Sequence, residues 1–163
     1  MNRRMLMIIL GIGLTLALGR GKATANSPLT PPCTPLSGTF IFTLFQFTSA
    51  TTAIGAGVVQ SEGHPVGTFS ANYFDIVQQG QGVIQLHGQH AISLSEGTLL
   101  TYDEIHLQSD NKNPAVFQAN ARLHVIGGTG AYSEATGLLH SHGELNVVTL
   151  EGGIDFKGQV CVP

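Results

Sequence analysis

The sequence has little charge, and most of the chain is almost without basic residues. Charged residues make up 10% of the 163 positions, and four of the seven Lys and Arg residues lie within the first 22 positions. The other three are Lys112, Arg122 and Lys157, which stand against ten acidic residues. Phosphate contacts need clustered Lys and Arg side chains, so three scattered cations exclude nucleic acid as a partner. The same scarcity excludes adhesion to an anionic membrane surface.

Cysteine is also scarce, and tryptophan is absent. The only cysteines are Cys33 and Cys161, so the chain contains no Cys-x-x-Cys redox motif. It also lacks the Gly-x-Ser-x-Gly motif of serine hydrolases. In an oxidising compartment we expect Cys33 and Cys161 to form a disulfide that encloses nearly the whole domain. Closing so long a loop contributes about 4–5 kcal/mol in the chain-entropy model.

The N-terminus has the pattern of a secretion signal. Arg3 and Arg4 precede an apolar run over residues 5–18. That run is shorter than the roughly 20 residues needed to cross a bilayer, and Ala23-Thr24-Ala25 is a site that signal peptidase accepts. We expect Sec-type export with cleavage after Ala25, a secreted or periplasmic protein, and no membrane insertion afterwards. The twin arginines leave Tat export as the alternative.

Removal of the 25-residue signal from 163 residues leaves 138, the size of one domain, with three cations against ten acids and a net charge of −7. Residues 26–36 form a Pro-rich lead-in, and we place the domain at 37–163.

Turn-forming residues recur every 8–15 positions, and no helical period lasts two turns, which predicts an all-β fold. The predicted strands are 38–47, 51–60, 66–74, 81–94, 98–108, 115–126, 136–150 and 154–161. Short connections favour an eight-stranded antiparallel meander, and closure into a calycin-like barrel removes exposed edges.

Two Gly-containing turns predict the pairing of neighbouring strands. A two-residue turn at Glu96-Gly97 pairs apolar with apolar side chains along one face. A turn at Gly152-Gly153 would likewise set Leu145 opposite Val160.

The first of these registers sets His90 opposite Asp103 on the apolar face. An imidazole beside a carboxylate in a dry interior could move protons on a bound ligand, so these two residues are the candidate catalytic pair. The alternative is structural: the two side chains satisfy each other, or they contact water at the mouth of the barrel.

Histidine alternates with a carboxylate late in the chain, which raises the question of a metal site. His140, His142 and Glu144 share one face of a predicted strand, and His124 falls on the same face of the preceding strand. Cross-strand imidazoles with a carboxylate can bind zinc, as in cupins, although the spacing departs from the cupin motif. A solvated His-rich face is the competing interpretation, and we predict no metal and no cofactor.

The run GGTGAYSEATG at residues 127–137 resembles the Gly-Gly-Thr-Gly-x-aromatic-x-x-Ala-x-Gly signature of the allene oxide cyclase/dirigent-like β-barrels, which include small secreted bacterial members. It lacks the Lys-Ser/Thr of a phosphate-binding loop, so we interpret it as a turn that needs positive φ. The likeness covers roughly residues 98–163. It implies an eight-stranded barrel with an apolar lumen, association as dimers or trimers, and no cofactor. In the plant relatives it implies steering of the cyclisation or radical coupling of small hydrophobic molecules.

Three functions follow for such a barrel. The first is binding of a small apolar ligand in the lumen, with His90 and Asp103 as a polar handle. The second is a cofactor-free isomerase or cyclase that uses this pair as acid and base, or a dirigent-like protein that uses the same pair. The third is a structural or surface protein whose lumen is filled by its own side chains. The predicted lumen residues are Phe40, Phe42, Ile84, Leu86, Ile92, Leu107, Leu123 and Leu139.

Overall fold

The computed structural model describes residues 32–80, 82–110 and 112–163. The predicted signal peptide and its cleavage site at Ala25 lie outside these residues. Within them, no helix is both long and apolar enough to cross a membrane. The elements are β1 (Cys33–Phe47), β2 (Ala53–Ser61), β3 (His64–Gln78), β4 (Val83–Leu94), β5 (Gly97–Ser109), β6 (Val116–Gly128), the 3₁₀ helix η1 (Gly130–Tyr132), β7 (Thr136–Asn146) and β8 (Gly152–Cys161).

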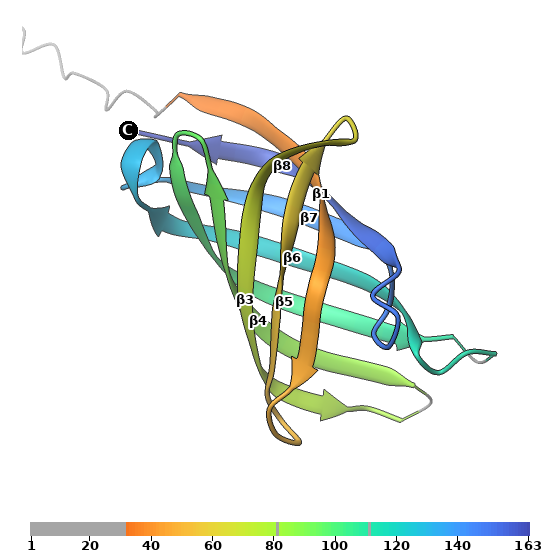
Figure 1. The fold of residues 1–163 in the computed structure, drawn as a ribbon. Coiled ribbons are helices and arrows are strands. Elements are labelled where there is room, and N and C mark those ends of the chain that lie inside the picture. The colour runs from red at the N-terminus through yellow and green to blue at the C-terminus, as the bar shows by residue number, and fades with distance from the viewer. Residues whose placement is uncertain (1–31, 81, 111) are drawn as a thin grey trace, which may run out of the picture.

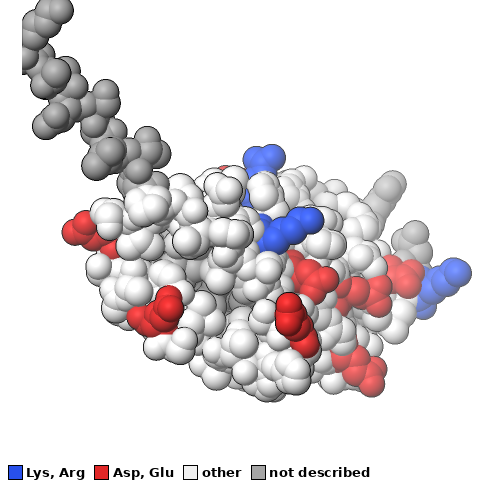
Figure 2. All heavy atoms as spheres, turned by 90° about the horizontal axis from the view of Figure 1, so that it is seen from above, with Lys and Arg blue, Asp and Glu red and all other residues white. Residues whose placement is uncertain are grey.

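The strands form one closed antiparallel barrel in which each pairs with its neighbour in sequence and β1 pairs with β8 (Figure 1). This confirms the predicted fold class. Strand β1 begins at Cys33, five residues before the first predicted strand, so the end of the Pro-rich lead-in is part of the barrel. Acidic and basic side chains are spread thinly over the face shown in Figure 2, most of which is uncharged.

The two ends of the barrel differ. One end, which we call the disulfide end, carries the β2–β3 and β4–β5 turns, the loop with η1, and both ends of the described chain (Figure 1). There Cys33 pairs directly with Cys161, and a disulfide joins them across 128 positions, as predicted. The other end, which we call the open end, carries the β1–β2, β3–β4, β5–β6 and β7–β8 loops.

The core has most of its fully buried apolar side chains toward the disulfide end. Phe40 lies at its centre, with ring centroids 4.8 Å from Phe69 and 4.5 Å from Phe156. Ile92 and Leu139 are fully buried in the same half. Inward and outward positions alternate along the strands, as the two-residue period of a β-strand requires.

The β4–β5 register differs by two residues from the predicted one. The turn consists of Ser95 and Glu96, so Leu94 pairs with Gly97, and His90 pairs with Thr101 instead of Asp103. A shift of two residues preserves which face each side chain occupies. His90 and Asp103 therefore remain together inside the barrel, as diagonal neighbours.

The β7–β8 register was predicted wrongly. Leu145 pairs with Gly152 instead of Val160, because the chain turns over residues 147–151. The side chain of Asn146 forms this turn, since its Oδ1 accepts hydrogen bonds from the backbone N–H groups of Val148 and Thr149. Asn is a turn former for this reason, and here it outweighs the Gly-Gly pair.

Candidate functional site

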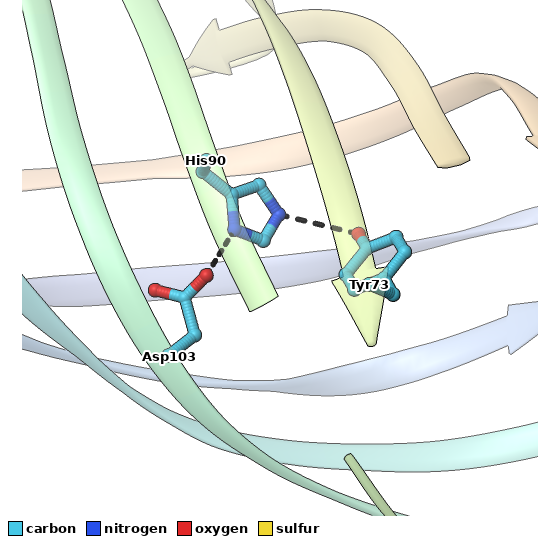
Figure 3. A network of polar contacts seen from close by, with 3 residues as sticks. All are labelled: Tyr73, His90 and Asp103. Atoms are coloured by element: carbon cyan, nitrogen blue, oxygen red, sulfur yellow. Dashed lines mark hydrogen bonds and ion pairs between the residues drawn. The ribbon is translucent and has the colours of Figure 1, made fainter. Parts of the chain in front are cut away.

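Three polar side chains form a hydrogen-bonded chain inside the barrel (Figure 3). The Nδ1 of His90 lies 2.5 Å from Oδ2 of Asp103, and its Nε2 lies 3.2 Å from the hydroxyl of Tyr73. Tyr73 comes from β3, His90 from β4 and Asp103 from β5, so three consecutive strands each supply one group. The imidazole bridges the phenol and the carboxylate.

Gly88 makes room for this bridge. It pairs with Tyr73 on one side and with Asp103 on the other, two positions before His90 on the same face of β4. A Cβ at Gly88 would lie 3.0 Å from Asp103 Oδ2 and 3.2 Å from Tyr73 Cδ1. Because glycine leaves this space empty, the ring of His90 can reach both neighbours.

The site is almost closed to solvent. Asp103 is 0% exposed, and His90 and Tyr73 are each 6% exposed. The pKa of Tyr73 lies well above its usual value, mainly because the phenol is buried and to a smaller extent because the Asp103 carboxylate is close. Tyr73 therefore stays protonated at neutral pH and can donate a hydrogen bond.

Two further polar atoms at this site have no hydrogen-bond partner in the described part of the chain. They are the second oxygen of Asp103, Oδ1, and the hydroxyl of Thr101, which is 1% exposed. Thr101 and Asp103 lie two residues apart on the inner face of β5. Buried polar atoms without partners are uncommon, and a catalytic role or an ordered water molecule can account for them.

The hydrogen-bonded chain has two consistent proton arrangements. In one, His90 donates from Nδ1 to Asp103 and accepts at Nε2 from the Tyr73 hydroxyl. In the other, His90 is protonated on both nitrogens and donates to Tyr73, which frees the phenolic O–H to donate elsewhere. The second arrangement holds one proton more than the first. A bound molecule that gives a proton to the Tyr73 hydroxyl, while Tyr73 passes its own proton to His90 Nε2, converts the first into the second, and the reverse transfer returns the proton, so the hydrogen-bonded chain has the chemistry of a general acid–base group.

An apolar cavity of about 70 Å³ lies beside Tyr73 and His90, toward the open end. Asp103 lies behind His90 and does not line it. Five of the eight predicted lumen residues line the cavity, namely Phe40, Phe42, Leu86, Leu107 and Leu123. Ile84, Ile92 and Leu139 do not. The rest of the lining is Phe45, Tyr73, His90, Ile105, Phe117, Ala119, Ala121, Ser141, Leu145, Val147 and Ile154.

Tyr73 is the site residue that was not predicted from the sequence. Its signal was the alternation in β3, where Phe69, Ala71 and Tyr73 are buried and the residues between them are exposed. The same alternation that placed His90 inside would have placed Tyr73 beside it.

The candidate metal residues His124, His140, His142 and Glu144 lie exposed on the outer face of β6 and β7. Glu144 accepts a hydrogen bond from Gln118. Across the described ranges, no three His, Cys, Asp or Glu side chains gather closely enough to hold a metal ion.

The architecture is that of a dirigent-like barrel. No protein-family model and no curated protein matches the chain. Among solved structures it is similar to the pterocarpan synthase dirigent protein GePTS1, with a TM-score of 0.51 and 15% sequence identity. The match covers 86% of this chain and 94% of that one. At this identity the likeness concerns the fold, and function has to be argued from the site.

Proposed function

We propose that the protein is an exported barrel that binds a small hydrophobic molecule in its lumen. The observation that carries the proposal is the cavity itself, which is lined almost wholly by aromatic and aliphatic side chains and lies toward the open end. Ligand pockets in proteins typically combine such a lining with a few polar groups. The disulfide supports export, because disulfides persist in oxidising compartments.

The size of the cavity constrains the ligand. A cavity of roughly 150 Å³ takes up benzene in a well-studied case, and this one measures about 70 Å³. A small apolar group fits as the side chains stand, while the rest of a larger ligand would lie among Phe45, Phe117 and Val147 nearer the open end. The Tyr73 hydroxyl and the His90 imidazole would then face a polar atom of the ligand.

Native mass spectrometry of the protein purified from its source tests this function directly. We expect a retained small molecule that Ala121→Phe abolishes, because the phenyl ring would occupy the cavity that Ala121 lines. The matched control is Ala91→Phe on the outer face of β4, opposite Leu100, which should retain the ligand. Absence of any ligand, together with no binding of an apolar fluorescent probe such as N-phenyl-1-naphthylamine, would favour a structural or surface protein instead.

The hydrogen-bonded chain supports a second candidate function, a cofactor-free isomerase or cyclase. Tyr73 contacts the cavity and has a proton-accepting partner in His90, which Asp103 orients. The similar dirigent protein GePTS1 is named a pterocarpan synthase. This second candidate function therefore includes a synthase activity for the present barrel. If the retained molecule is converted by the protein, Tyr73→Phe and Asp103→Asn should reduce turnover far more than retention. Turnover equal to that of the wild type in both variants would rule out acid–base catalysis by these residues, and the binding function would remain.

A further inference from the structure

A row of side chains crosses the outer face of six strands and points away from the lumen. Each member pairs in register with the next, from β3 to β8. In order, the row consists of Phe74, His87, Glu104, Arg122, His140 and Lys157. Adjacent strands lie about 4.8 Å apart, so the row is an extended track roughly 24 Å long.

A second row runs beside the first on β5 to β8. It consists of His106, Asn120, His142 and Asp155, again paired in register. Between the rows the surface is hollowed into a groove of about 420 Å³ over β5 to β7, and a neighbouring groove of about 300 Å³ extends over β3 to β5. Glu104 and His106 line both, so the two grooves are continuous.

The polar side chains in the middle of these rows have unused hydrogen-bonding capacity. Six of them make no side-chain hydrogen bond or ion pair with any described residue: Glu104, His106, Asn120, Arg122, His140 and His142. Glu104 and Arg122 face each other across β5 and β6, yet they form no salt bridge within 4.0 Å. Their donors and acceptors point into a groove, where a ligand can meet them.

One end of the track is aromatic. The ring of His87 stacks on Tyr102 with centroids 5.5 Å apart, and Phe74 lies 5.9 Å from His87. All three rings are half-buried, so part of each remains exposed, and Nδ1 of His87 also lies 3.4 Å from Oδ2 of Asp75. Exposed clustered rings on a polar surface mark interaction sites.

We propose that this outer groove binds a neutral carbohydrate chain. A sugar ring offers an apolar C–H face to aromatic rings, and its hydroxyls donate to and accept from planar side chains such as Glu, Asn, Arg and His. Both kinds of group lie along the track. The rows and grooves carry two cationic side chains, Arg122 and Lys157, and three carboxylates, Glu104, Asp155 and Asp75. The groove therefore lacks the large excess of one sign that a polyanion or polycation would require.

Affinity gel electrophoresis of the oxidised full-length protein, with polysaccharide in the gel, tests the proposal. The neutral panel is hydroxyethylcellulose, laminarin, dextran and mannan, and alginate is the anionic comparison. We expect retardation by at least one neutral polysaccharide, and at least tenfold weaker binding for Tyr102→Ala and for Asn120→Ala. Asn120 is exposed, so its variant should fold even if Tyr102→Ala does not. The control is Thr43→Ala on the outer face of β1, which should bind like the wild type.

Four results would overturn the proposal. No retardation by the neutral panel would show that the groove binds no such chain. Equal retardation of Asn120→Ala and wild type would place binding elsewhere. Retardation by alginate alone, lost at high salt, would indicate a purely electrostatic contact. Self-association that Asn120→Ala abolishes, measured by analytical ultracentrifugation without polysaccharide binding, would assign the groove to a second copy of the chain. Lumen binding of the apolar probe should be unchanged in Asn120→Ala, which separates this proposal from the lumen function.

Discussion

At the scale of single residues, the buried carboxylate of Asp103 depends on its partner. A buried charge without a partner is costly, so His90→Leu, which leaves the Asp103 carboxylate unpaired, should lower the free energy of unfolding by about 3–5 kcal/mol. Replacement of both partners, His90→Leu with Asp103→Leu, should cost less than the sum of the single changes, because it leaves neither group unpaired. Urea unfolding at pH 7 measures the single variants His90→Leu and Asp103→Leu and the double variant.

The neighbouring outward-facing residue provides the control for this cycle. Glu104→Ala should change the free energy of unfolding by no more than about 0.5 kcal/mol, because Glu104 is exposed. Strictly additive losses for His90 and Asp103 would show that the two side chains do not stabilise each other.

Tyr73 should make the protein sensitive to alkali. Its pKa is raised in the folded state, so above about pH 10 the unfolded chain loses the Tyr73 proton and the folded chain keeps it. The unfolded state then binds fewer protons, and the free energy of unfolding falls by about 1.4 kcal/mol per pH unit from this residue; below pH 10 the effect vanishes. Tyr73→Phe should remove this slope in urea unfolding between pH 9 and 11.

Tyr102→Phe is the matched control, because Tyr102 lies on the outer face of the barrel. Tyr132, whose pKa is raised by burial and by Glu96, contributes equally in both variants. Identical alkaline slopes for wild type and Tyr73→Phe would mean that the folded barrel lets Tyr73 ionise.

The inward positions of the candidate pair could be predicted from the sequence. The face of a strand on which a side chain lies depends only on whether its position in that strand is odd or even. His90 and Asp103 reach the interior under any register that keeps this parity, and the actual register is shifted by two. Their contact depends in addition on Gly88, whose missing side chain allows the diagonal approach. Nothing in the local sequence distinguishes a glycine that creates space from one that forms a turn.

At the scale of elements, the loop over residues 127–135 explains why the β4–β5 register differs from the predicted one. A Cβ at Gly97 would lie 2.1 Å from the carbonyl oxygen of Thr129. Gly97 is therefore needed for the close approach of this loop and is not part of the turn. The positive φ values expected in this run are present at Gly127 and Gly130. A contact between residues some thirty positions apart decided the turn, and a local pattern does not contain it.

The attachment of this loop to the β4–β5 hairpin can be tested at Thr129. The backbone N–H of Thr98 donates to the Thr129 hydroxyl at 3.1 Å. Thr129→Val removes the acceptor and should lower the free energy of unfolding by about 0.5–1.5 kcal/mol in urea. Thr136→Val is the control, because Thr136 is exposed and its side chain makes no hydrogen bond with the described residues. Equal stability of the two variants would show that the hydroxyl does not hold the loop.

At the scale of the whole molecule, the disulfide and the cavity lie toward opposite ends of the barrel. The strand count and closure followed from turn spacing and the need to cover sheet edges, whereas the difference between the ends depends on packing. Toward the disulfide end, large rings such as Phe40 and Phe156 meet and fill the lumen. Toward the open end, Ala119 and Ala121 face it and leave the cavity.

This separation predicts that stability and lumen binding respond differently to loss of the disulfide. Cys33→Ser with Cys161→Ser should lower the free energy of unfolding by up to about 4–5 kcal/mol, since the unfolded chain gains the entropy of an open loop across 128 positions. The barrel should nevertheless stay closed between β1 and β8 in the folded state, because these strands remain paired from Thr34 and Val160 to Phe40 and Ile154. Urea unfolding and titration with the apolar probe measure the two effects on the same samples. A folded double variant that no longer binds the probe would show that the disulfide end controls the cavity; a loss below about 1 kcal/mol would mean that strand pairing alone closes the barrel.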